Sequence, residues 1–221
     1  MSYQVYALRY AEKDLKECQF FFREASQAPL TLHYYLWVIL GGPHPLVVDT
    51  GFAAAEAQRR EARKWVSPAE MLARVGVKAA EVPVTLISHL HWDHWGGRGF
   101  FPGSQFWVQR EELAFWTGVG GQYEVFRMFA IPESLAELVR LNYAGRVRLV
   151  EGEVEVLPGV TAHWVGGHTA GLQIVTSLPQ MLRGFDRIDE LAGASRLVVV
   201  GHDPEVARRF DEVEPGIVRI A

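Results

Sequence analysis

Apolar residues in the first half of the chain recur mostly in short runs bounded by glycine, proline and charged residues, a pattern typical of β-strands. The runs predict strands at residues 5–9, 31–40, 46–48 and 84–87. Two stretches follow the helical period instead, one over residues 53–65 and one that begins at Ser67. The order Ser67-Pro68-Ala69-Glu70 predicts a capping box and a helix to about Val75.

The second half alternates between strand and helix patterns. Strands are predicted at residues 104–109, 146–150, 154–157, 160–165 and 197–200, and helices at 110–116, 131–141 and 178–192. The connection over residues 117–130 is long, aromatic and glycine-bearing, which is more typical of a lid or binding element than of a simple connector. Because no repeat or linker interrupts the pattern, we expect one mixed α/β (α+β) domain over residues 1–221.

Composition disfavours some classes of function. The 221 residues are 49% hydrophobic, enough for a sizeable core, and their net charge of -4 disfavours nucleic acid as a partner. Cys18 is the single cysteine, so no intrachain disulfide is expected. The chain starts without a charged segment leading into an apolar one, and the run at residues 34–40 is too short to span a bilayer. We therefore expect a cytoplasmic protein with no membrane partner.

The candidate chemistry is concentrated directly after the predicted strand at residues 84–87. The segment reads His89-Leu90-His91-Trp92-Asp93-His94 and holds four side chains that can bind a metal. Imidazole nitrogen and carboxylate oxygen suit Zn²⁺, and a catalytic zinc site needs about three such ligands and an open position. His89 and His91 point the same way in extended chain, whereas Asp93 and His94 fall beyond them in the loop. The spacing predicts two adjacent metal positions, the alternative being a solvated histidine-rich turn.

Two more histidines, His168 and His202, follow predicted strands among flanking glycines. The chain resembles the metallo-β-lactamase superfamily, and within it the N-acyl-homoserine lactonase group. The motifs that carry this resemblance extend over nearly the whole chain: Val48-Asp49-Thr50-Gly51, Ser88-His89-Leu90-His91-Trp92-Asp93-His94, Gly167-His168-Thr169-Ala170-Gly171 and Val200-Gly201-His202-Asp203-Pro204.

The resemblance implies an αββα sandwich of two mixed sheets flanked by helices, with a dinuclear metal site between the sheets. The first metal is implied on His89, His91 and His168, and the second on Asp93, His94 and His202. Asp49 matches a family position that supports the ligand loop from behind. We expect one or two Zn²⁺ ions, with manganese, cobalt or iron as other suitable metals.

The implied activity is hydrolysis of a lactone ring, in which metal ions activate water and polarise the carbonyl while Asp93 helps to steady the leaving oxygen. The expected partner is a small lactone or ester, with N-acyl-homoserine lactones and quorum quenching as the leading hypothesis. Two alternatives remain open, because the donor set alone does not choose the acyl group. One is a hydrolase of other esters or thioesters, and the other is a degenerate family member that binds metal without turnover.

The chain departs from the family where an aspartate normally bridges the two metals. After Gly171 only residues 172–177 precede the predicted helix at 178–192, so a segment that carries this aspartate and a tyrosine is absent. Asp186, Asp189, Glu190 and Asp203 are not evident substitutes. Without the shared carboxylate we expect weaker dinuclear binding. The lost strands also leave a sheet edge that a homodimer would cover.

The remaining histidines and the aromatic residues receive different expectations. We expect His33, His44 and His163 to be structural or solvated. Four aromatic residues crowd the metal loop and are candidates to line the substrate pocket, namely Trp92, Trp95, Phe100 and Phe101.

Overall fold

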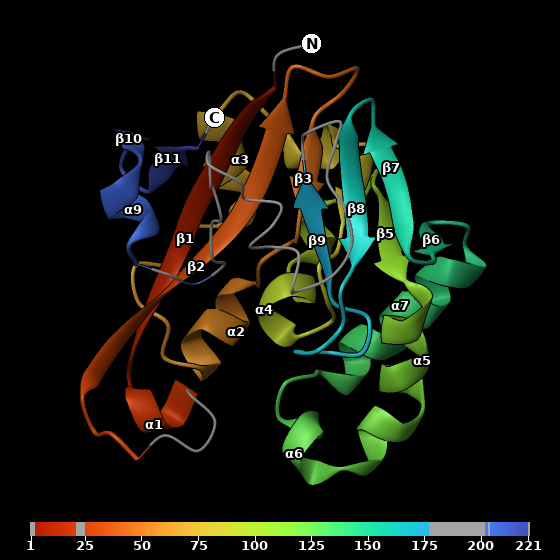
Figure 1. Ribbon diagram of the computed structural model, residues 1–221, viewed down its shortest axis with the longest axis horizontal. Helices are drawn as coiled ribbons and strands as arrows, with labels where there is room; N and C mark the ends of the chain where they lie inside the picture. The colour runs from red at the N-terminus through yellow and green to blue at the C-terminus, as the bar shows by residue number, and fades with distance from the viewer. Residues whose placement is uncertain (1–2, 21–24, 177–201, 203, 221) are drawn as a thin grey trace.

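In the part of the chain that the structure describes, two β-sheets pack face to face, one of eight strands and one of three (Figure 1). The computed structural model describes residues 3–20, 25–176, 202 and 204–220. The large sheet contains β1 (Gln4–Lys16), β2 (Pro29–Leu40), β3 (Leu46–Val48), β4 (Val84–Leu86), β5 (Gln105–Gln109), β6 (Val147–Val150), β10 (Asp211–Glu214) and β11 (Ile217–Arg219). The small sheet contains β7 (Glu153–Leu157), β8 (Val160–Trp164) and β9 (Gln173–Thr176).

The helices are mostly short. The α-helices are α1 (Glu17–Phe20), α2 (Ala54–Arg59), α3 (Pro68–Arg74), α4 (Trp92–Trp95), α5 (Arg110–Thr117), α6 (Glu124–Arg127), α7 (Pro132–Tyr143) and α9 (Val206–Arg209). Single turns of 3₁₀-helix occur at η1 (Ala79–Glu81), η2 (Arg98–Phe100) and η3 (Val119–Gln122). Within the described residues no helix is long and apolar enough to cross a membrane.

The strand order of the large sheet is β10-β11-β1-β2-β3-β4-β5-β6, and that of the small sheet is β7-β8-β9. Strands β3 to β6 are parallel neighbours, whereas β1, β2, β10 and β11 pair antiparallel, so the large sheet is mixed as expected. The parallel run places the carboxyl ends of β3, β4 and β5 along one edge. Open α/β sheets typically carry their sites at such an edge.

Alternation along the central strands builds two hydrophobic layers. Leu46 and Val48 on β3 face the small sheet, where they join a buried cluster that contains Val160 and Ala162 of β8. Val47, between them, faces the other way and packs with Leu72 of α3 and the other helices. Burial on both faces explains why this three-residue strand is entirely apolar. The predicted arrangement of two sheets flanked by helices is confirmed, but only the large sheet is mixed, because the described strands of the small sheet all pair antiparallel.

Two elements differ in length from the sequence prediction because of tertiary contacts. Strand β1 was expected to end near Arg9 but runs to Lys16, because residues 11–16 pair with β2. Glu12 in this extension is buried and pairs with Lys64. The backbone of Glu12 also forms an isolated antiparallel bridge with Arg63, with N···O distances of 2.9 and 2.6 Å. This pairing holds residues 61–64 away from helical geometry, so α2 ends at Arg59 rather than near residue 65.

Of the other elements, helix α3 was predicted, strands β10 and β11 were not, and two predicted elements cannot be compared with the structure. Helix α3 begins at Pro68, and the Ser67 side chain accepts a hydrogen bond from the Glu70 N–H, whereas the Glu70 carboxylate pairs with Arg74. The connection at residues 117–130 contains η3 and α6. Strands β10 and β11 were not predicted, because β10 is acidic and exposed and β11 has only three residues. The predicted helix at 178–192 and strand at 197–200 lie outside the described residues.

Candidate metal centre

The six predicted donor side chains come together in two neighbouring groups, His89, His91 and His168, and Asp93, His94 and His202. The first two histidines follow β4, and His168 lies between β8 and β9 of the small sheet. Asp93 and His94 lie on the single-turn helix α4 rather than in the loop that the sequence predicted. His202 lies beside the start of β2 and is hydrogen-bonded to the backbone of His33.

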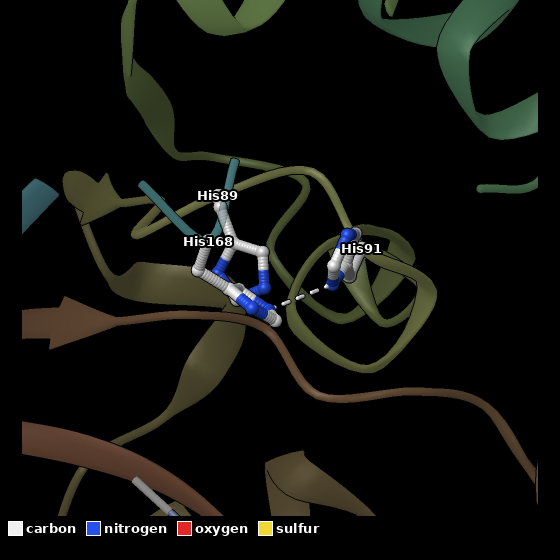
Figure 2. A group of neighbouring side chains, drawn as sticks. All are labelled: His89, His91 and His168. Atoms are coloured by element: carbon white, nitrogen blue, oxygen red, sulfur yellow. Dashed lines mark hydrogen bonds between the residues drawn. The ribbon is translucent and has the colours of Figure 1, made fainter. Parts of the chain in front are cut away.

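The first group brings three imidazoles into contact (Figure 2). The ring centroid of His89 lies 4.5 Å from that of His91 and 4.9 Å from that of His168. His168 Nε2 lies 3.2 Å from His91 Nδ1. One nitrogen from each ring falls within 4.8 Å of the others, close enough for a single ion to contact all three.

The protonation of this group also fits a metal ion. His89 Nδ1 donates to Ser88 Oγ at 3.0 Å, and its Nε2 is buried without a hydrogen-bond partner. Burial lowers the pKa of His89 well below its usual value, lowers the pKa of His91 to about 3, and also lowers the pKa of His168. The three rings are therefore neutral at physiological pH, which is the form that binds a metal.

The second group is charged. Asp93 Oδ2 lies 3.4 Å from Nε2 of both His94 and His202. Burial opposes ionisation of Asp93, but the adjacent His94 and His202 outweigh it and hold the pKa of this carboxyl well below its usual range. Burial likewise opposes the charge on His94, yet Asp93 and Asp49 raise its pKa to about 10. A metal ion in this group has to displace the proton of His94.

Asp49 fixes the geometry of both groups from behind. It follows β3 with φ of 69°, a left-handed conformation that few residues other than glycine adopt. Its carboxylate accepts the Ser88 N–H at 2.7 Å, the Ser88 hydroxyl at 2.9 Å and His94 Nδ1–H at 2.7 Å. These bonds connect the end of β3 to both the segment after β4 and helix α4. Asp49 thus lies behind the segment that carries the donors, where the resemblance implied it.

Further supporting residues escaped the sequence analysis. The Thr50 hydroxyl donates to the His94 carbonyl at 2.8 Å, and the Tyr10 hydroxyl donates to the Asp93 carbonyl at 3.0 Å. Gln173 on β9 is buried, and its N–H and side-chain amide donate to the carbonyls of Ser88 and Ile87. The apolar neighbours Ile174 and Val175 were the available signal for Gln173, and Thr50 belongs to the Val48-Asp49-Thr50-Gly51 motif, whereas Tyr10 carries no signal that is visible in sequence.

The four aromatic pocket candidates occupy different surroundings. Trp95 and Phe101 are fully buried in the main core, where the Trp95 ring packs edge-on against Phe106. Phe100 lines a cavity of about 480 Å³ that contains none of the six donors. Trp92 lies under the guanidinium of Arg60 and is nearly buried. These positions favour a structural role for Trp95 and Phe101.

The other histidines behave as the sequence analysis expected. His33 is buried, and its carbonyl accepts the Nδ1–H of His202 at 3.0 Å. His163 contacts Thr176 across the small sheet, and His44 contacts the Pro45 carbonyl. Within the described residues, no carboxylate belongs to both donor groups. Asp186, Asp189, Glu190 and Asp203 lie outside the part of the chain that the structure describes.

The connection at residues 117–130 reaches the donor groups. The Phe129 ring stacks on the His91 imidazole, with centroids 5.0 Å apart and planes 24° apart, and its carbonyl accepts the Trp92 N–H at 2.9 Å. Much of the rest of this segment is apolar and exposed to solvent: Val119, Tyr123, Val125, Phe126, Met128 and Phe129 itself. The segment therefore presents an apolar surface beside the first donor group.

Comparison with known proteins points to one family. The family model of the metallo-β-lactamase superfamily matches residues 32–178 of this chain. An N-acyl homoserine lactonase from Bacillus cereus is 29% identical over 160 residues, which cover 65% of this chain and 58% of that protein. An N-acyl homoserine lactonase from Bacillus thuringiensis is 34% identical over 103 residues, covering 47% of this chain and 36% of the relative. The aligned regions thus span only part of these relatives.

Solved structures share the fold at lower sequence identity. An N-acyl homoserine lactone hydrolase with the product N-hexanoyl-L-homoserine at its catalytic metal centre aligns with a TM-score of 0.74 and 21% identity, covering 97% of this chain and 98% of that one. The dizinc quorum-quenching lactonase AidC aligns with a TM-score of 0.63 and 15% identity, covering 79% and 67%.

The first prediction concerns metal stoichiometry. The first donor group is neutral and has an unpartnered nitrogen, whereas the second holds a protonated histidine and shares no carboxylate with the first among the described residues. After zinc loading and dialysis, we expect elemental analysis to give closer to one metal than two per chain. A stable count of two would show that another carboxylate completes the bridge.

The second prediction concerns pH. Because a metal in the second group displaces the His94 proton, its affinity should rise between about pH 6 and pH 8, while the first group should change less. Zinc titration by calorimetry in buffers of different ionisation enthalpy counts the protons released. Asp49→Asn removes one charge that stabilises the His94 proton, so the second step should release fewer protons. Equal pH dependence of both steps would contradict this assignment.

Proposed function

Because this chain belongs to the metallo-β-lactamase superfamily, we propose that it is a metal-dependent hydrolase that opens the lactone ring of N-acyl homoserine lactones. The single observation that carries the proposal is the pair of adjacent donor groups, whose closest histidine rings, His89 and His94, have centroids 4.0 Å apart. The names of the similar proteins supply the lactone class. Because the alignments span 58% or less of these relatives, the substrate is part of the proposal.

The donor groups suit hydrolysis at neutral pH. We assign His89, His91 and His168 to one divalent metal and Asp93, His94 and His202 to a second, with zinc as the leading choice. Such ions, when bound, lower the pKa of a water molecule and polarise a carbonyl oxygen. Asp93 is also the catalytic residue of the proposal, because as a donor to the second metal it would hold that ion where its charge can steady the departing ring oxygen.

Substrate preference is proposed from the surroundings of His91. The Phe129 ring covers one face of this imidazole, and the Trp116 ring lies edge-on to it at 5.6 Å. The exposed apolar side chains of residues 119–129 continue this surface outward. An uncharged ester with an apolar tail fits these neighbours better than a phosphate diester.

The third prediction tests the substrate class. The zinc-loaded protein should open acyl-homoserine lactones faster than it cleaves bis-nitrophenyl phosphate, and its rate should depend on acyl length because apolar residues border the donors. Ring opening is measured by pH indicator, and nitrophenol release by absorbance. Faster phosphodiester cleavage, or no effect of acyl length, would reject the lactonase assignment while leaving the fold intact. Faster cleavage of linear esters or thioesters would favour the alternative hydrolase.

The fourth prediction separates catalysis from metal binding alone. His91→Ala and Asp93→Ala should each lower lactone hydrolysis by on the order of 10²-fold or more, because each removes a group beside the reacting atoms. His44→Ala, in a turn remote from the donors, is the matched control and should keep its rate. Circular dichroism checks that all three variants stay folded. An unaltered protein that binds zinc but opens no lactone above the metal-only blank would instead be the degenerate family member.

A further inference from the structure

Glu112 is a buried carboxylate that the proposed reaction does not use. It lies in the first turn of α5, has no solvent exposure, and accepts three hydrogen bonds from neutral groups. Its Oε1 accepts the Leu90 N–H and the Trp116 indole N–H, both at 2.8 Å, and its Oε2 accepts the Gly171 N–H at 2.7 Å. Three charge-assisted bonds offset the cost of burying a carboxylate at this position.

The donors to Glu112 belong to the segments that carry the first donor group. Leu90 lies between His89 and His91, so a bond to its N–H restrains the backbone that connects these two ligands. Gly171 is three residues beyond His168, in the connection between β8 and β9. One carboxylate therefore ties the ligand segment of the large sheet to the ligand loop of the small sheet.

Glu112 also acts on His91 through a third contact. The Trp116 indole that it holds packs edge-on against the His91 ring, with centroids 5.6 Å apart. Phe129 stacks on the same imidazole at 5.0 Å. The ring of His91 is thus restrained on more than one side, and one of the restraints depends on Glu112.

The contact with Gly171 leaves no room for a side chain. A Cβ atom added at Gly171 would lie 2.3 Å from the backbone nitrogen of Glu112 and 2.5 Å from its Cβ. Any other residue would push the loop away from α5 and lengthen the bond to Oε2. The glycine of the Gly167-His168-Thr169-Ala170-Gly171 motif is explained by this close approach.

We propose that Glu112 is a positioning residue that holds His89, His91 and His168 in the geometry for one metal ion. The inference rests on the proposed function only in that this group binds a divalent metal. A carboxylate is needed because both of its oxygens accept. Glutamine at this position has one accepting oxygen, so its NH₂ must face either the Gly171 N–H or the N–H groups of Leu90 and Trp116, and one segment loses its restraint.

The test is the affinity of the full chain for Zn²⁺, measured by competition with a chromophoric chelator. We expect Glu112→Gln to bind the first Zn²⁺ about 10- to 100-fold more weakly than the unaltered chain, as is typical when a partner behind the ligands is lost. When Co²⁺ replaces Zn²⁺, the visible absorption spectrum of Glu112→Gln should differ from that of the unaltered chain, because the ligand geometry is changed. Glu111→Gln, the neighbour on α5, is the matched control and should bind Zn²⁺ normally.

A second control separates positioning from general stability. Ser67→Ala removes the N-cap of α3, remote from the donors, so it should lower the melting temperature without changing Zn²⁺ affinity. Glu112→Gln should reduce the rise in melting temperature that Zn²⁺ produces, whereas Ser67→Ala should keep that rise.

Each outcome bears on the inference. Equal Zn²⁺ affinity in Glu112→Gln and the unaltered chain would overturn the positioning role alone, whereas failure of the unaltered chain to bind Zn²⁺ would refute the proposed function. If Glu112→Gln does not fold, Glu112→Asp is the variant that tests the positioning role, since it keeps the carboxylate charge but has a shorter side chain. Weakened Zn²⁺ binding by Glu112→Asp supports the role, and unchanged binding overturns it.

Discussion

The ion pair between Asp49 and His94 is the contact on which the geometry of the candidate site depends. Asp49 Oδ2 and His94 Nδ1 are 2.7 Å apart in a nearly solvent-free environment, where an unpaired charge would be very unfavourable. The same carboxylate binds the backbone and hydroxyl of Ser88, the residue before His89. One side chain thereby sets the position of the segment after β4 relative to α4, which explains why Asp49 tolerates a left-handed backbone.

The two donor groups differ in electrostatic character despite sharing one edge of the sheet. The three imidazoles of the first group are neutral, with His89 and His91 buried and His168 exposed, so they resemble a preformed ligand set. The second group already holds balancing charges, with the His94 imidazolium between Asp49 and Asp93. The charges of the second group balance one another, whereas the buried Nε2 of His89 has no hydrogen-bond partner. The two donor groups are consequently asymmetric in charge.

The sequence predicted the donors better than it predicted their supports. Closely spaced histidines with Asp93 indicate the candidate donors, and the structure brings these side chains together. The short apolar strand at residues 46–48 is likewise visible from hydropathy alone. By contrast, two of the three partners of Glu112, Leu90 and Gly171, come from positions 22 and 59 residues away in sequence, so no local pattern reveals them. The early end of α2 likewise results from pairing with Glu12 on β1, a contact that overrides helix propensity.

The location of His168 on the small sheet, opposite ligands carried by the large one, has a consequence for the order of assembly. The triad is complete only after the two sheets have docked, because 77 residues separate His168 from His91 along the chain. Contacts between such distant residues form late in folding, since closing the loop between them costs entropy. On the proposed assignment, binding of one ion to all three histidines marks finished folding, and an ion that binds only the docked sheets stabilises them.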